Sequence, residues 1–153
     1  MSSGAAFSRG RRLGVDVGKV RVGVAWCDPD GILATPLETV ARDTASGEDV
    51  PSDIRRIAEL TAEHGIVEIV VGLPVTLKGT ESFAAVEARE YVKLLAQNIT
   101  GVPVHLVDER LTTVVASRRL TERGVKGKRK RAVVDQAAAV EILQHWLDRQ
   151  RKA

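Results

Sequence analysis

The chain has 153 residues, of which 44% are hydrophobic, so it is long enough for one domain with a buried core. Its formal net charge is only +3, and Cys27 is its single cysteine, which excludes an intramolecular disulfide and a cysteine-based zinc site. No apolar run approaches the roughly 18 residues of a membrane span. The first ten residues lack the apolar stretch of a signal peptide, so we expect a cytoplasmic protein that does not bind membranes.

The start of the chain predicts a short tail and three strands. Residues 1–9 are expected to form a flexible tail, and 10–153 a single domain. Alternating apolar residues favour strands over 12–17 and 20–26, with a tight reversal between them, and a third strand over 32–40. Because Pro36 cannot donate a backbone hydrogen bond, the third strand should lie at an edge or contain a bulge. We therefore expect an antiparallel meander.

The middle of the chain predicts two helices with a strand between them. The first helix should be capped by Ser52 or Asp53 and ended by Gly65. The almost continuously apolar run 66–72 is typical of a central parallel strand that is covered on both faces. A second helix is predicted over 82–98. The residues expected on its inner face are Phe83, Val86, Tyr91, Val92 and Leu95.

The last third of the chain predicts one more central strand, over 102–109, and two more helices. A helix is expected over 113–123, a loop rich in glycine and cations over 124–131, and a long helix over 132–150. Three strands, helix, strand, helix, strand, helix is the order of an α/β layer fold with a mixed sheet.

Acidic side chains stand where the predicted strands end. Asp16 lies near the end of the first strand, Asp108 and Glu109 lie at the end of the last one, and Asp135 is predicted in the first turn of the last helix. Because functional groups of α/β sheets gather at the carboxyl ends of strands, these acids could meet at one place. Taken singly, each acid could equally be a salt-bridge or capping residue, and Asp108 or Glu109 could pair with Arg110.

Carboxylates that meet at one place repel each other unless a cation lies among them, and oxygen ligands favour Mg²⁺ or Mn²⁺. Two such ions, typically about 3.5–4 Å apart, can activate a water and stabilise the leaving oxygen of a phosphodiester. We therefore expect Asp16, Asp108, Glu109 and Asp135 to be metal ligands, with Asp16 bridging the ions.

A dense run of basic residues over 118–131 predicts contact with a polyanion. A solvated loop is the alternative. Since aromatic residues make up only 3% of the chain, a platform for stacking single-stranded bases is not expected, and recognition should depend on backbone and shape. The basic residues expected to bind nucleic acid here are Arg118, Arg119, Lys126, Lys128, Arg129, Lys130 and Arg131.

Four segments together resemble a known family in the same order and over nearly the whole chain. They are "LGVDVGKVRVGVAWCDPDGILATPLETV", "IVVGLPVTLKGTE", "VDERLTT" and "VVDQAAAVEIL". This combination closely resembles the YqgF/RuvX family of bacterial ribonuclease H-like proteins. The resemblance implies a ribonuclease H-like fold with a mixed five-stranded sheet and a metal-dependent nuclease. It also implies action at the 5′ end of pre-16S ribosomal RNA and similarity to Holliday junction resolvases.

Matching motif to motif places the family's acids on Asp16, on Glu109 with Asp108 beside it, and on Asp135. Two turns differ from the usual family pattern. The turn after the first aspartate is "GKVR", in which the cation has moved while Arg21 stays, and the loop 78–81 reads "KGTE", with a lysine in place of an acid. These changes leave the three proposed ligands intact and put in doubt substrate contacts inferred by analogy.

The favoured function is therefore a metal-dependent endonuclease, a hydrolase of phosphodiesters in structured RNA, with Arg21 and Arg110 as further nucleic-acid contacts. Its partners would be precursor ribosomal RNA and ribosomal precursor particles. One alternative is a Holliday junction resolvase on branched DNA, which would require a homodimer with two opposed sites. Another is a nucleic-acid-binding assembly factor without hydrolysis. An ATPase of the actin-like class also begins with an aspartate and a glycine, but it closes two domains around its nucleotide.

Overall fold

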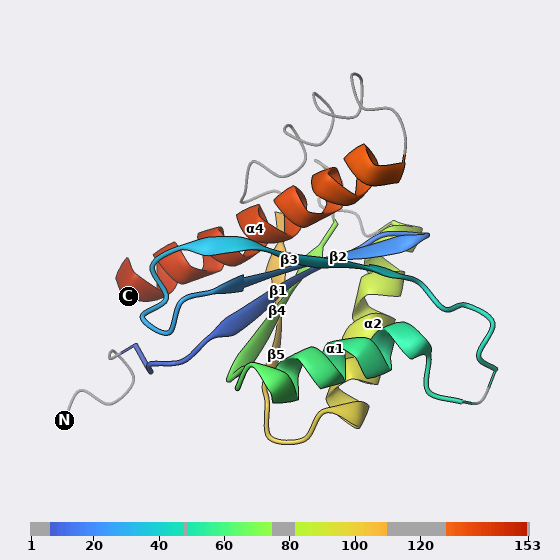
Figure 1. Ribbon diagram of the computed structural model, residues 1–153, viewed down its shortest axis with the longest axis horizontal. Coiled ribbons are helices and arrows are strands. Elements are labelled where there is room, and N and C mark those ends of the chain that lie inside the picture. Colours follow the sequence, from blue (N-terminus) through green and yellow to red (C-terminus); the bar gives the residue numbers. More distant parts are fainter. Residues whose placement is uncertain (1–6, 48, 75–81, 110–127, 153) are drawn as a thin grey trace.

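The computed structural model is a five-stranded mixed sheet with helices on both faces (Figure 1). The structure describes residues 7–47, 49–74, 82–109 and 128–152, without the side chains of 128–133 and 152. The strands are β1 (Arg12–Val17), β2 (Arg21–Cys27), β3 (Ala34–Ala41), β4 (Glu68–Leu73) and β5 (Val104–Asp108). The helices are α1 (Ser52–Glu63), α2 (Phe83–Asn98) and α4 (Lys128–Lys152).

The strands lie in the order β3-β2-β1-β4-β5. β1 pairs antiparallel with β2, β2 pairs antiparallel with β3, and β1, β4 and β5 run parallel, which confirms the predicted mixed sheet. β3 is an edge strand whose register shifts where Ala25 pairs with Pro36, as the proline predicts. The strand expected centrally over 102–109 is instead the other edge, β5, so that expectation was wrong.

The two faces of the sheet are covered by different helices, α4 on one face and α1 with α2 on the other (Figure 1). The α1 and α2 face holds the larger core, built mainly from branched aliphatic side chains such as Val15, Ile57 and Ile69. The α4 face has its own core, in which Val70 and Val107 of the sheet pack against Leu143. Among the described residues no helix is long and apolar enough to cross a membrane.

Two expectations about α1 and α2 were wrong. Neither Ser52 nor Asp53 caps α1, because the N-cap is Pro51 and Asp53 is buried, where it accepts a hydrogen bond from the Tyr91 hydroxyl at 2.8 Å. Burial next to this carboxylate raises the pKa of Tyr91 above its ordinary value.

In α2 the buried residues are Ala85, Ala88, Tyr91 and Leu95, whereas Phe83 is 73% exposed and Val86 50% exposed. The helix therefore presents small residues to the sheet at its N-terminal end. Ala85 and Ala88 pack with Leu73 of β4, which brings the start of α2 close to the strand. The close packing is confined to this end of the helix, since Tyr91 and Leu95, expected on the inner face, are buried further along.

α4 begins four residues before the predicted start, at Lys128. The segment 128–131 is therefore helix and not loop, consistent with the high helix propensity of lysine and arginine. Asp135 consequently lies more than one turn inside the helix, and no acidic residue is in the first turn. The expected stabilisation of Asp135 by the helix N-terminus is wrong, since that effect fades beyond the first turn.

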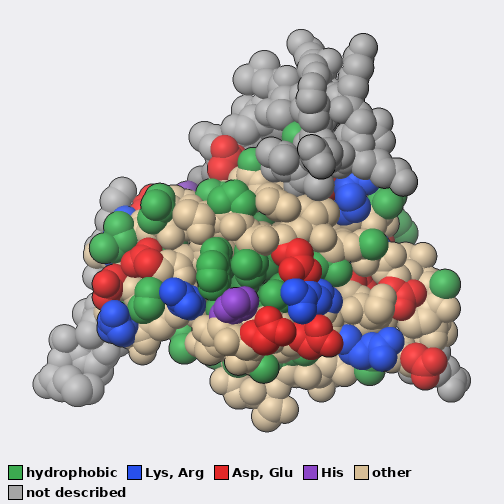
Figure 2. Space-filling model, in the orientation of Figure 1, with side chains coloured by type: hydrophobic (Ala, Val, Ile, Leu, Met, Phe, Trp, Pro, Cys, Tyr) green, Lys and Arg blue, Asp and Glu red, His purple; other side chains and the backbone are tan. Residues whose placement is uncertain are grey.

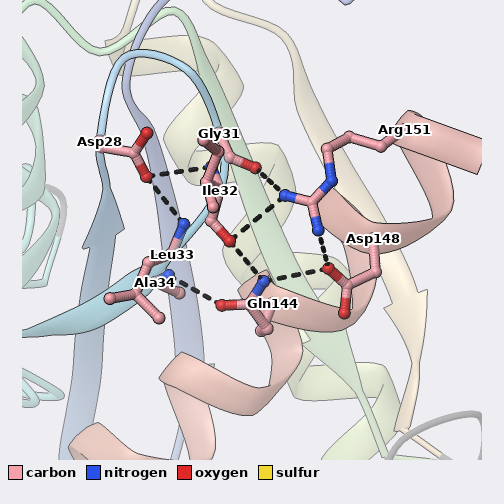
Figure 3. A network of polar contacts seen from close by, with 8 residues as sticks. All are labelled: Asp28, Gly31, Ile32, Leu33, Ala34, Gln144, Asp148 and Arg151. Carbon is pink, nitrogen blue, oxygen red and sulfur yellow. Dashed lines mark hydrogen bonds and ion pairs between the residues drawn. The ribbon is translucent and has the colours of Figure 1, made fainter.

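The loop between β2 and β3 is fastened to the C-terminal half of α4 (Figure 3). Asp28 accepts backbone N–H groups of Leu33 at 2.7 Å and Ile32 at 3.0 Å, which lowers the pKa of this carboxyl below its ordinary value. From α4, Gln144 accepts the N–H of Ala34 at 2.8 Å and donates to the carbonyl of Ile32 at 2.9 Å. These contacts join two segments that lie more than a hundred residues apart in the chain.

Candidate active site

Three glycines let α4 lie unusually close to the sheet. A Cβ atom built on Gly14 would lie 2.6 Å from the Cβ of Leu143, and one on Gly72 would lie 2.5 Å from a methyl carbon of Ile142. A Cβ on Gly23 would overlap the backbone carbonyl of Asp135. Strand glycines of this kind mark places where another backbone approaches closely. They fix where the helix crosses the strand ends.

Asp16 is on the same face of the sheet as these glycines. It is two residues from Gly14 in β1, and alternate residues of a strand point to the same face. Its partner across the antiparallel ladder is Gly23, the residue above which Asp135 passes. Asp16 is only 5% exposed, and it has interactions within the protein. The buried carboxylate that the sequence predicted at this strand therefore faces α4.

Glu109 follows β5 directly and lies over β4. Its Oε1 atom is 2.8 Å from the position that a Cβ on Gly72 would occupy, and the residue is only 2% exposed. β1 pairs with β4 as far as Val15 with Val71, so the next step along both strands sets Asp16 beside Gly72. Because neighbouring strands are about 4.8 Å apart, Asp16 and Glu109 occupy adjacent positions on one face.

Asp135 reaches this region from the other layer, through α4. Its Oδ2 atom accepts a hydrogen bond from Nε of Arg21 at 2.8 Å, in a partly buried ion pair. Arg21 is in β2, two residues from Gly23, and so shares its face. The structure thus brings Asp16, Glu109 and Asp135 to one end of the sheet and pairs one of these acids with an arginine.

The three carboxylates supply the hard oxygen donors that Mg²⁺ and Mn²⁺ prefer. Their arrangement, however, is not that of a finished metal site. Among the residues that the structure describes, no three His, Cys, Asp or Glu side chains are grouped so that they could hold a metal ion. The chemistry of the donors fits a divalent cation. The pairing of Asp135 with Arg21 does not fit one, because the arginine occupies an oxygen of that carboxylate.

Asp108, the fourth predicted metal ligand, lines a separate pocket of about 170 Å³ at the edge of the sheet. His145, Trp146 and Arg149 of α4 line the same pocket. Among the described side chains, Nε2 of His145 is a buried nitrogen without a hydrogen-bond partner. Asp108 is thus beside Glu109 in sequence but contributes to a different surface.

Most of the predicted nucleic-acid contacts lie outside the described part of the chain. This applies to Arg110, Arg118, Arg119 and Lys126 as whole residues. For Lys128, Arg129, Lys130 and Arg131 the structure describes the helical backbone alone. Arg21 is the one predicted contact whose side chain is described, and it lies beside the acids.

The face shown in Figure 2 has acidic and basic side chains interspersed outside the grey region. Basic and acidic side chains also pair elsewhere in the described residues: Arg56 forms an ion pair with Glu38 at 2.8 Å and another with Glu59 at 3.1 Å. The pKa of Glu38 is lowered by its hydrogen bond with Arg56. The described residues of this face therefore form a mixed surface and not a single-sign patch for a polyanion.

Sequence reasoning placed the acids at the strand ends but missed two features of the site. The first is the role of Gly14 and Gly23, which allow α4 to approach the sheet closely. The sequence indicated it only by placing a glycine inside each of two predicted strands. The second is the contact of Arg21 with Asp135. These residues are 114 positions apart, and no local pattern links them.

Comparisons with known proteins show the family and the fold of this chain. A family model described as "RuvX: Holliday junction resolvase" matches residues 10–149. A protein of Rhodococcus erythropolis named "Putative pre-16S rRNA nuclease" is 55% identical over 145 residues, or 95% of this chain and 81% of its own. A protein of the same name from Streptomyces coelicolor is 55% identical over 150 residues, or 98% of this chain and 87% of its own.

Among solved structures, the chain is similar to "T. thermophilus RuvC in complex with Holliday junction substrate", with a TM-score of 0.59. The match covers 92% of this chain and 95% of that chain at 16% sequence identity, a level at which the likeness concerns the fold. The fold is therefore ribonuclease H-like, as the sequence predicted. With a family model that spans residues 10–149 and relatives more than half identical, the chain belongs to the RuvX family.

Proposed function

We propose that this protein is a metal-dependent endonuclease that cleaves structured RNA, with the 5′ end of pre-16S ribosomal RNA as its preferred substrate. The observation that carries the proposal is the pair of buried carboxylates, Asp16 at 5% and Glu109 at 2% exposure, at adjacent positions on the face of the sheet that α4 covers with Asp135. The names of its relatives point to the RNA substrate. Buried acids at the carboxyl ends of parallel strands are where the chemistry of an α/β fold is expected.

The cofactor in this proposal is Mg²⁺ or Mn²⁺. Two buried carboxylates at adjacent positions on one face of the sheet repel each other, and a cation between them lowers the cost of keeping both ionised. Asp16 and Glu109 would hold the ion, and Asp135 would join them. When bound, a divalent cation supplies Lewis-acid stabilisation of charge on a phosphodiester.

The residues that hold the substrate are proposed to be basic. Lys128, Arg129, Lys130 and Arg131 precede Asp135 in the same helix, and in this proposal their positive charge serves the substrate near the acids. Arg110, Arg118, Arg119 and Lys126 would extend this charge, and Arg21 would contact phosphate next to the acids. Binding should weaken steeply as salt rises, because phosphate contacts release counterions. We further propose that 10–153 acts as one domain, in the cytoplasm, on ribosomal precursor particles.

The test is a cleavage assay on a pre-16S RNA fragment with the purified protein and its Asp16→Asn variant, in Mn²⁺, Mg²⁺ or a chelator. The amide keeps the shape of the side chain and removes its charge, so we expect the variant to bind RNA but to lose cleavage by at least 100-fold, on the order of effects at metal or oxyanion groups. Equal cleavage by both proteins would contradict the assignment. Binding without cleavage by either would favour an assembly factor.

A second candidate substrate is the four-way DNA junction, because the matching family model is described as a Holliday junction resolvase. Resolution requires two sites acting on opposite strands and hence a homodimer. A junction offered in the same assay, together with the molecular mass in solution by light scattering, distinguishes the two. Symmetric cuts by a dimer would favour the junction, and a monomer that cuts only RNA would exclude it.

A further inference from the structure

The ion pair between Arg21 and Asp135 is built so that it can open without moving the backbone. The backbone of Arg21 is fixed by a hydrogen bond from the N–H of Gly18 to its carbonyl at 2.9 Å. Next to Asp135, the side chain of Gln136 donates to the Thr39 hydroxyl at 2.9 Å and ties α4 to β3. The two charged side chains are 29% and 20% exposed. Rotation of either side chain is therefore enough to separate them.

The pair occupies an oxygen that a cation at the three acids would need. Nε of Arg21 lies 2.8 Å from Oδ2 of Asp135, a distance typical of a charge-assisted hydrogen bond. A divalent ion bound by Asp135 would come close to this guanidinium, and the two positive charges would repel each other. A guanidinium also balances only one of the three carboxylate charges. Arg21 is thus a weaker substitute for the cation.

The rest of the Arg21 guanidinium is available to a phosphate. Among the residues that the structure describes, Nε is the atom of Arg21 with a hydrogen bond, and its two Nη groups have none. A guanidinium fork binds two phosphate oxygens at once through parallel N–H groups. A phosphate of a bound nucleic acid could therefore compete with Asp135 for this arginine.

We propose that Arg21 is a positioning residue that holds Asp135 in the cation-free protein and gives it up to the metal site when a nucleic-acid phosphate binds the arginine. This inference rests on the proposed function and adds a coupling between the binding of nucleic acid and the binding of the cation. Cation and nucleic acid bind cooperatively, because each takes one partner of the same ion pair. By thermodynamic linkage, the factor by which nucleic acid raises the affinity for the cation equals the factor by which the cation raises the affinity for nucleic acid.

The first experiment measures Mn²⁺ binding to the protein without nucleic acid, by the loss of the electron paramagnetic resonance signal of free Mn²⁺. In Arg21→Gln the carboxylate of Asp135 is released, so we expect the dissociation constant to fall on the order of tenfold, within the usual range of coupling between sites. Arg21→Lys keeps a positive charge and should stay closer to the wild type. Arg56→Gln removes another ion-paired arginine, that of Glu38, and should change nothing.

The second experiment measures RNA binding by fluorescence anisotropy in chelator, where the proposed cleavage does not occur. Asp135→Asn frees Arg21 for phosphate, so RNA should bind several-fold more tightly than to the wild type. Asp148→Asn is the matched control, because Asp148 is also paired with an arginine of this chain, Arg151. It removes the same charge from the same helix but leaves Arg21 paired. In Arg21→Gln the gain from Asp135→Asn should disappear.

The outcomes separate this inference from the proposed function. Asp16→Asn should weaken Mn²⁺ binding with or without Arg21; if it does not, the metal site itself is absent. If Asp16→Asn weakens Mn²⁺ binding but Arg21→Gln leaves the Mn²⁺ dissociation constant unchanged, the ion pair has only a structural role and the inference is overturned. An equal gain in RNA affinity from Asp135→Asn and Asp148→Asn would also overturn it. Circular dichroism melting of each variant checks that it folds.

Discussion

The two faces of the sheet differ in what they bury. Against α1 and α2 the strands present a continuous layer of large aliphatic side chains, among them Leu13, Val15 and Ile69. Against α4 the same strands present Gly14 and Asp16 beside a smaller apolar cluster that includes Val70 and Val107, and the helix comes in close contact. One face therefore holds the larger aliphatic core, and the other combines a smaller core with buried charged groups. Stability and the candidate site are divided between two sides of one sheet.

The largest expected effect on stability comes from a substitution in the core between the sheet and helices α1 and α2. Ile57 is fully buried in this core. Replacing it with alanine should lower the free energy of unfolding by about 2–5 kcal/mol, through lost burial and the cavity that remains. Urea denaturation measures this loss. At a temperature where the variant is still folded, its Mn²⁺ binding should match the wild type; a parallel loss of binding would mean that the two faces are not separate.

Gly23→Ala should destabilise the protein less than Ile57→Ala but should affect Mn²⁺ binding more. The new methyl group would overlap the backbone carbonyl of Asp135, so α4 must shift. Overpacking of this kind costs about 1–3 kcal/mol. The shift should also weaken Mn²⁺ binding. Gly47→Ala is the control, because its Cβ would meet no atom within 4 Å and the left-handed backbone of Gly47 is its main cost.

The smallest effect concerns acid stability, at the loop that ties β2 and β3 to α4. Backbone hydrogen bonds from Leu33 and Ile32 hold the pKa of Asp28 below its ordinary value of 3.8. The stabilisation is therefore fully present above that pH and is lost as the pH falls below it. Asp28→Ala should melt at a lower temperature than the wild type at pH 7, and the difference should narrow below pH 3.8. A constant difference across this range would show that the carboxylate charge does not matter.

The limits of prediction from sequence are clearest when α2 is compared with β1. The bounds of β1 agree with the predicted 12–17, because alternating apolar residues followed by a turn glycine form a local pattern. In α2 the bounds were also close, and Tyr91 and Leu95 are buried as predicted, but Phe83 and Val86 are exposed. Large apolar residues such as Phe83 suggested the inner stripe, whereas the sheet accepts the smaller Ala85 and Ala88. Which side of a helix is buried depends on the shape of its neighbour.

For the candidate site, strand-end reasoning and the family resemblance agreed on the acids that meet. They did not indicate that Asp135 would be more than a turn inside its helix or that Arg21 would hold it. Both depend on how α4 lies across β1 and β2, which is set by contacts between distant parts of the chain. The glycines at positions 14, 23 and 72 were visible in the sequence, but their common role appears only when the strands are placed side by side.

The late position of α4 in the chain has a consequence for how the protein folds. All five strands precede this helix, yet it forms a whole layer over them and carries Asp135. The contact from Arg21 to Asp135 spans 114 positions, a long loop to close, and contacts of such separation form slowly. As the chain emerges during synthesis, the sheet can assemble on α1 and α2 well before the acids are complete. Under the proposed assignment of Asp135 to the site, a nuclease built in this order stays inactive until its last helix has docked.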